Sequence, residues 1–226
     1  MWKTLLKISI KLAMIVVGVL GIVFSASSTS FMANGYVFMF FTVQSNITIM
    51  AISLVFLIND VLVLFKKDSF VGQKLYLTKY AFTVAITITF LVFFAVLAPT
   101  LGIDYLLSFN NFSLHLIVPV LALIDFFIFD MDIDLSYKNS LLGCLMPLYY
   151  VVFFLIGIPL GFRYTDTGLK APYFFLNYEE IGWFQITSKG PGVIVYILGM
   201  MVLIVGLCFL FTLLMKLRKG ELKKDN

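Results

Sequence analysis

The feature that most constrains this chain is a series of apolar runs, several of which exceed 18 residues with almost no charge. Runs of this length cross the roughly 30 Å hydrocarbon core of a bilayer as helices. The composition agrees, because 62% of the residues are hydrophobic and only 12% are charged. Soluble domains are about half apolar and a quarter charged. We therefore predict a polytopic membrane protein and not a soluble domain with a large core.

The runs predict an all-α bundle of six transmembrane helices that forms a single domain over residues 1–226. The expected spans cover residues 5–27, 38–65, 76–98, 112–129, 139–160 and 193–217. Pro147 predicts a kink in the fifth span, because proline removes a helix hydrogen bond. The first run follows three lysines and resembles a signal peptide. It is nearer twenty residues than ten, so we expect it to remain as an anchor.

The basic residues predict the orientation of the bundle. With six spans both termini lie on one side, and the segments on that side hold 13 of the 16 Lys and Arg residues. The opposite segments hold three, namely Arg163, Lys170 and Lys189. Because Lys and Arg concentrate in cytoplasmic loops, both termini are predicted to be cytoplasmic. The net charge of +4 arises at these span ends, so we expect no nucleic-acid partner.

The head of the second span is unusually polar for its surroundings. Between Phe40 and Asn46 the polar side chains are those of Thr42, Gln44, Ser45 and Asn46. Polar groups inside a membrane are costly and are typical of functional sites. At about 100° per residue, Ser53 and Asp60 project from nearly the same helix face as Thr42. We expect this polar stripe to face the interior of the bundle.

Thr42 and His115, the single histidine, are the candidate catalytic pair. Both lie a few residues inside the predicted outer ends of their spans, so we expect them at a similar depth. A neutral imidazole can remove the proton that makes a threonine hydroxyl a poor nucleophile. The structural alternatives remain open: the threonine bonds its own helix backbone, and the histidine is a packing group.

Three segments carry a resemblance to a known family. They are Phe41-Thr42-Val43, His115-Leu116-Ile117-Val118-Pro119 and Pro172-Tyr173-Phe174-Phe175-Leu176-Asn177. In order and helix number the chain resembles the androgen-induced protein and androgen-dependent TFPI-regulating protein family, including its bacterial six-span relatives. The resemblance implies a multi-pass protein of a bacterial plasma membrane.

The resemblance also implies an activity. Animal members of this family are intramembrane threonine hydrolases of fatty acid esters of hydroxy fatty acids, so it implies Thr42 as nucleophile and His115 as base. No cofactor or metal is expected, and the partner is a membrane lipid or lipid ester. Candidate substrate-binding or oxyanion residues are Gln44, Ser45, Asn46, Tyr173 and Asn177. Asn177 replaces an acidic residue of the family, and the cluster at 44–46 points to a different natural substrate.

Other interpretations stay open at this stage. The main alternative function is a non-enzymatic transporter or lipid-binding protein that uses the polar stripe, and another is a catalytically inactive relative. The aromatic segment 161–192 forms an ordered lid over a site or a belt at headgroup level.

The remaining acidic residues and the cysteines carry expectations of their own. Asp60 and Asp125 belong to an ion path or pair with lysines. We expect a solvated turn at Asp130, Asp132 and Asp134 in preference to a cation site. Cys144 and Cys208 are expected to be buried thiols.

Overall fold

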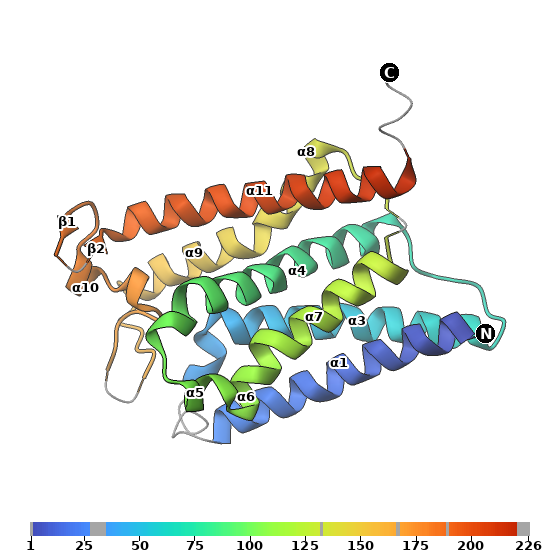
Figure 1. Cartoon of the computed structure of the whole chain (residues 1–226), viewed down its shortest axis with the longest axis horizontal. Helices are drawn as coiled ribbons and strands as arrows, with labels where there is room; N and C mark the ends of the chain where they lie inside the picture. Colours follow the sequence, from blue (N-terminus) through green and yellow to red (C-terminus); the bar gives the residue numbers. More distant parts are fainter. Residues whose placement is uncertain (1, 28–34, 132, 166–167, 189, 221–226) are drawn as a thin grey trace.

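The computed structural model describes residues 2–27, 35–131, 133–165, 168–188 and 190–220. Within these ranges six helices are long and apolar enough to cross a membrane, and they run side by side (Figure 1). They cover Trp2–Ser27, Phe41–Leu64, Gln73–Thr100, Phe109–Phe129, Tyr137–Gly157 and Val193–Lys219. Every span end lies within three residues of the predicted one. The all-α six-span bundle is confirmed.

Three of the spans are continuous α-helices, and three are composite. The continuous ones are α1 (Trp2–Ser27), α3 (Phe41–Leu64) and α11 (Val193–Lys219). The third span joins α4 (Gln73–Val92), the π-helix η2 (Phe93–Leu97) and the 3-10 helix η3 (Ala98–Thr100). The fourth joins α6 (Phe109–Phe112), the π-helix η4 (Ser113–Ile117), α7 (Val118–Ile124) and the π-helix η5 (Asp125–Phe129). The fifth joins α8 (Tyr137–Ser140), the 3-10 helix η6 (Leu141–Cys144) and α9 (Leu145–Gly157).

Prolines account for the irregular helix segments near the site. A proline has no N–H, and its ring clashes with the carbonyl four residues earlier, so the preceding turn widens or tightens. Pro99 and Pro119 follow the π-helices η2 and η4 in this way. The irregularity at Pro147 is the 3-10 helix η6, which ends three residues before the proline.

The two ends of the bundle differ. We call the end where α1 begins and α11 ends the terminal end, and the opposite one the lid end (Figure 1). The lid end carries η1 (Tyr36–Met39), α5 (Ile103–Leu107) and the connection between α9 and α11. That connection contains η7 (Phe174–Leu176), α10 (Tyr178–Ile181) and the antiparallel pair β1 (Ile186–Thr187) and β2 (Gly190–Pro191). The lysine distribution predicts that the terminal end faces the cytoplasm.

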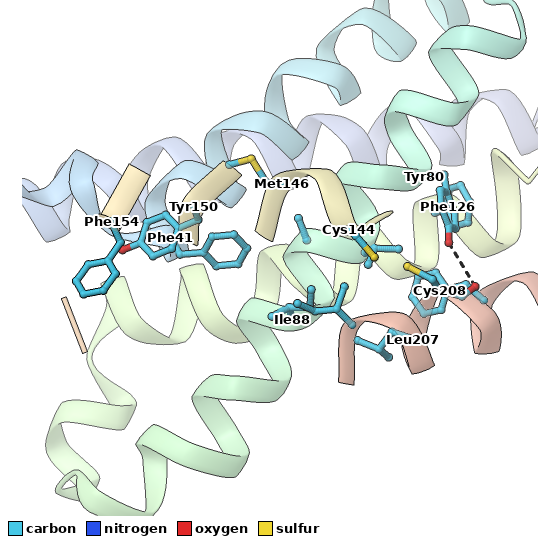
Figure 2. Packing of buried hydrophobic residues seen from close by; sticks show 14 of the residues in the cluster. Phe41, Tyr80, Ile88, Phe126, Cys144, Met146, Tyr150, Phe154, Leu207 and Cys208 are labelled. Carbon is cyan, nitrogen blue, oxygen red and sulfur yellow. Dashed lines mark hydrogen bonds between the residues drawn. The ribbon is translucent and has the colours of Figure 1, made fainter. Parts of the chain in front are cut away.

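The largest buried cluster packs α4, the fifth span and α11 together (Figure 2). The Tyr80 hydroxyl lies 3.0 Å from the Ser140 carbonyl and 3.4 Å from the Cys208 carbonyl, so it joins all three spans. Cys144 and Cys208 are both buried and free, as predicted. A buried tyrosine that satisfies its hydroxyl in this way adds a directional link to an otherwise apolar interface.

A buried charge network occupies the interior toward the terminal end. We use this name for Lys7, Lys11, Lys79, Asp60, Asp125 and Asp130. Lys11 Nζ lies 2.7 Å from Asp125 Oδ1, 2.9 Å from Asp130 Oδ2 and 3.0 Å from Asp60 Oδ2. Lys79 contacts the carboxylates of Asp125 and Asp130. Three ammonium groups face three carboxylates, so the network is neutral and ties α1, α3, α4 and η5 together.

The π-helix η5 is what brings two of the carboxylates together. The Asp130 N–H donates to the Asp125 carbonyl at 3.2 Å, the five-residue bond of a π-turn, and shares this bond with the Phe126 carbonyl at 3.1 Å. In an α-helix, residues five apart project about 140° from each other. The wider turn lets Asp125 and Asp130 face the same lysines.

The charge network decides between an ion path and lysine pairing for the acidic residues. Asp60 and Asp125 pair with lysines, which was one of the two alternatives. The expected solvated turn is wrong for Asp130, which is fully buried because its charge is matched by lysines. Asp134 is exposed, and Asp132 lies outside the described residues. Burial alone would raise the pKa of the Asp130 carboxyl, but the surrounding lysines, Lys79 foremost, hold it at about 2.

Removing one carboxylate from the network should destabilise the fold strongly. Asp125→Asn leaves the ammonium groups of Lys11 and Lys79 short of a buried counter-charge, a situation that typically costs about 3–5 kcal/mol. We expect a large loss of thermal stability for the purified protein, measured by its melting transition. The control is Asp104→Asn, an exposed carboxylate on α5, which should change little. Equal stability of the two variants would contradict a structural role for the network.

Candidate active site

A cavity of about 90 Å³ lies among the spans toward the lid end. Thr42 at the start of α3 and His115 on η4 both line it, together with Tyr173 from the lid connection. The rest of its wall is almost entirely aromatic and aliphatic, including Phe93 and Tyr150. Few polar groups converge in an apolar enclosure, which is the usual make-up of a small-molecule site.

His115 is held by a ring stack between two π-helices. Its imidazole lies parallel to the Phe93 ring, with a centroid distance of 3.7 Å and an interplanar angle of 10°. Phe93 opens η2 and His115 sits in the middle of η4, so both rings belong to widened turns. His115 is 8% exposed, and its Nδ1 atom is buried without a hydrogen-bond partner among the described residues. The ring is fixed by packing while its polar edge stays available.

Thr42 lies at the first turn of α3, where backbone N–H groups have no intrahelical acceptor. Its N–H donates to the Tyr173 hydroxyl at 3.4 Å, and its side chain also contacts that phenol. Burial raises the pKa of Tyr173 above its usual value, against hydrogen bonds from Thr42 that lower it. Tyr173 therefore remains a protonated donor near neutral pH. No hydrogen bond joins Thr42 directly to His115 among the described residues.

Asn46 connects the two halves of the site. Its side-chain amide donates to the Thr42 carbonyl at 2.7 Å and to the Leu114 carbonyl at 3.1 Å. Leu114 immediately precedes His115, so one buried amide fixes the backbone at both candidate catalytic residues. Ser45 bonds the Thr42 carbonyl at 3.0 Å and the Thr89 hydroxyl at 2.7 Å, which links α3 to α4. The polar cluster at the head of α3 therefore braces the site.

The structure separates the predicted site residues into two groups. Thr42, His115 and Tyr173 line one cavity. The others do not line it: Gln44 donates to the Phe38 carbonyl at 3.0 Å, and Ser45 and Asn46 use their donors on backbone or neighbouring hydroxyl groups. Asn177 also lies outside the cavity wall, and its carbonyl accepts from the N–H groups of α10.

The lid connection takes part in the cavity wall. Tyr173, Phe175 and Leu176 line it, and the Tyr173 and Phe175 rings stack with a centroid distance of 5.1 Å. The basic residues of this segment that the structure describes, Arg163 and Lys170, are engaged elsewhere. Lys170 pairs with Glu179, and Arg163 donates to the carbonyls of its own turn.

Among the cavity residues that the sequence did not single out, Phe93 and Tyr150 make the most specific contacts. Phe93 is one of 25 phenylalanines, and only the π-helix places its ring on His115. Tyr150 donates its hydroxyl to the Met39 carbonyl at 3.1 Å and packs edge-on against Phe41 (Figure 2). The nearby Pro99, Pro119 and Pro147 are the sequence signals that departures from a regular helix occur there.

Comparisons with protein-family models, curated proteins and solved structures found no match to this chain. The family resemblance of the sequence therefore remains a hypothesis, and the site has to be interpreted from its own geometry.

Loss of the Asn46 amide should loosen the site and the bundle together. Asn46→Leu keeps the branching and the number of heavy side-chain atoms but leaves the Thr42 and Leu114 carbonyls without this donor, which typically costs about 1–3 kcal/mol. The melting temperature of the purified variant should fall clearly. Thr48→Val, a polar-to-apolar change two residues along α3, removes only a bond to the Ser45 carbonyl and should have a small effect. A melting temperature unchanged by Asn46→Leu would show that the amide does not brace the site.

Proposed function

We propose that the protein is an intramembrane threonine hydrolase of lipid esters, with Thr42 as nucleophile and His115 as general base. The observation that carries the proposal is that Thr42, His115 and Tyr173 line one largely apolar cavity. They come from α3, η4 and the lid connection, which are far apart in the sequence. The resemblance to the androgen-induced protein family suggests fatty acid esters of hydroxy fatty acids as the substrate class.

The reaction would run in two stages. His115 takes the Thr42 hydroxyl proton as Oγ1 bonds to the ester carbonyl carbon. The bond from that carbon to the alcohol oxygen then breaks, and the alcohol leaves with the proton held by His115. In the second stage His115 deprotonates a water that attacks the acyl-threonine. The fatty acid departs, and the proton returns to Thr42. Catalytic hydrogen bonds are commonly long or absent before substrate binds. Substrate binding would bring the Thr42 hydroxyl and the His115 imidazole within hydrogen-bond distance.

The oxyanion formed in each stage needs donors, and two converge beside Thr42. The Thr42 N–H has no intrahelical acceptor at the N-terminus of α3, and it donates to the Tyr173 hydroxyl. An ester oxygen placed between them would accept from both the N–H and the phenol. Each such donor contributes about 3 kcal/mol to the transition state in known hydrolases.

The cavity volume limits which part of a substrate enters. About 90 Å³ is well below the several hundred Å³ of sites that enclose a whole ligand. The ester group and a nearby piece of chain fit this space. The hydrocarbon arms would extend from it between the spans into lipid. A long-chain ester in the membrane meets this requirement, whereas a soluble polar substrate does not.

The transport alternative has less support. A path along the polar stripe would have to pass from Asn46 through Ser53 to Asp60. Ile49, Ile52 and Phe56, at 0%, 5% and 1% exposure, are buried along the same helix. Asp60 is already paired with Lys7 and Lys11. These contacts favour a closed, packed interior on the terminal side of the site.

Removing either catalytic group should abolish ester hydrolysis. Thr42→Val deletes the nucleophilic hydroxyl and His115→Gln deletes the base, so each should lower turnover of a long-chain ester panel by about 10²-fold or more. The assay uses the full chain in lipid nanodiscs and follows fatty acid release. Thr48→Val is the matched control on α3 and should retain activity. Undiminished turnover in both site variants would overturn the proposal.

Tyr173→Phe tests the oxyanion role separately. The variant keeps the ring and its stack on Phe175 but loses the hydroxyl, so kcat should fall about 10²- to 10³-fold with little change in KM. A variant that instead raises KM at constant kcat would assign Tyr173 to substrate binding alone.

A further inference from the structure

A second recess, of about 460 Å³, lies between α4 and the fifth span, and the proposed hydrolase site does not use it. We call it the α4–α9 groove. One wall is the α4 face formed by Lys74, Leu77, Thr78, Ala81 and Phe82. The other is the face formed by Leu142, Leu145, Met146 and Tyr149. Leu145 and Tyr149 are 57% and 50% exposed, so the groove opens at the surface that would face lipid.

The two helices beside the groove approach each other closely at a glycine. A Cβ atom at Gly143 would come within 3.0 Å of the Val84 side chain. This close crossing draws the backbones together, and the larger side chains on either side flank a depression. Both walls consist of residues that recur every three or four positions and so lie on one face of their helix. The depression therefore follows the helices along the membrane normal. An acyl chain has the shape and polarity that such a groove accepts.

A single cation marks one end of the groove. Lys74 is exposed and lies in the first turn of the third span, at the terminal end of the bundle. Among the described residues it forms no ion pair, unlike Lys7, Lys11 and Lys79, and only its carbonyl is engaged, by the Thr78 hydroxyl at 3.0 Å. Lysines at this level contact lipid headgroups, and they favour anionic ones.

We propose that the α4–α9 groove binds an anionic phospholipid of the cytoplasmic leaflet, with one acyl chain in the groove and the headgroup phosphate at Lys74. Charge complementarity selects this occupant over a zwitterionic lipid. The ammonium lies where the headgroups of that leaflet are, provided that the terminal end faces the cytoplasm as the lysine distribution predicts. The site is independent of Thr42 and His115.

The experiment is native mass spectrometry of the full chain with equimolar phosphatidylglycerol and phosphatidylcholine. We expect about a fivefold preference for phosphatidylglycerol, the ratio that one lysine contact of about 1 kcal/mol gives. Lys74→Gln should remove the preference. Lys67→Gln, which removes another exposed cation beyond the terminal end of α3, should keep it. Equal retention of both lipids by the wild type, or equal loss in the two lysine variants, would overturn the site.

Filling the groove tests the acyl chain. Ala81→Phe adds bulk to one wall and should lower retention of both lipids by severalfold. Because Ala81 is nearly buried, Thr78→Phe at a half-buried position serves as a second variant if the first fails to fold. Full retention in a folded groove-filling variant would show that no chain occupies the recess.

Discussion

The structure depends on the pairing of three lysines with three aspartates inside an apolar bundle. A lone charge at this depth is costly, whereas the neutral charge network is stabilised only when α1, α3, α4 and η5 all contribute their side chains. Lys11 alone contacts carboxylates from two different spans at 2.7–3.0 Å. Hydrocarbon packing has little directional preference in lipid, so these contacts fix which helices are neighbours and in which register. The register of α3 and the fourth span then sets where Thr42 and His115 lie.

Departures from regular α-helix create the second level of organisation. Each π-helix of the described residues carries a cavity-lining or charged side chain: Phe93 in η2, His115 in η4 and Asp125 in η5. Widened turns rotate side chains away from their α-helical positions, which is why they occur so often at functional sites. In this chain, η2 and η4 stack the His115 imidazole on the Phe93 ring toward the lid end. Toward the terminal end, η5 aligns the carboxylates of Asp125 and Asp130. The buried Asn46 amide joins α3 to η4 near the level of His115, toward the lid end.

The sequence predicted the spans closely because apolar run length and basic flanks determine them almost alone. It also predicted that Thr42 and His115 share a depth, and both line one cavity. It did not predict the partnership of Asp125 with Asp130, because a 3.6-residue period places them on different faces. Nor did it predict that Asn46 braces the backbone, since its acceptor on Leu114 comes from another helix. Contacts of this kind arise from tertiary packing, and the local periodicity of the sequence carries no information about it.

Locating a covalent adduct would show whether Thr42 is a nucleophile. The full chain in nanodiscs is treated with a fluorophosphonate probe, and tandem mass spectrometry assigns the modified residue. We expect a phosphonylated Thr42 in the wild type and none in His115→Gln, because the hydroxyl reacts only when a base removes its proton. An unmodified Thr42 in an otherwise active protein, or an adduct on another residue that persists in Thr42→Val, would contradict this assignment.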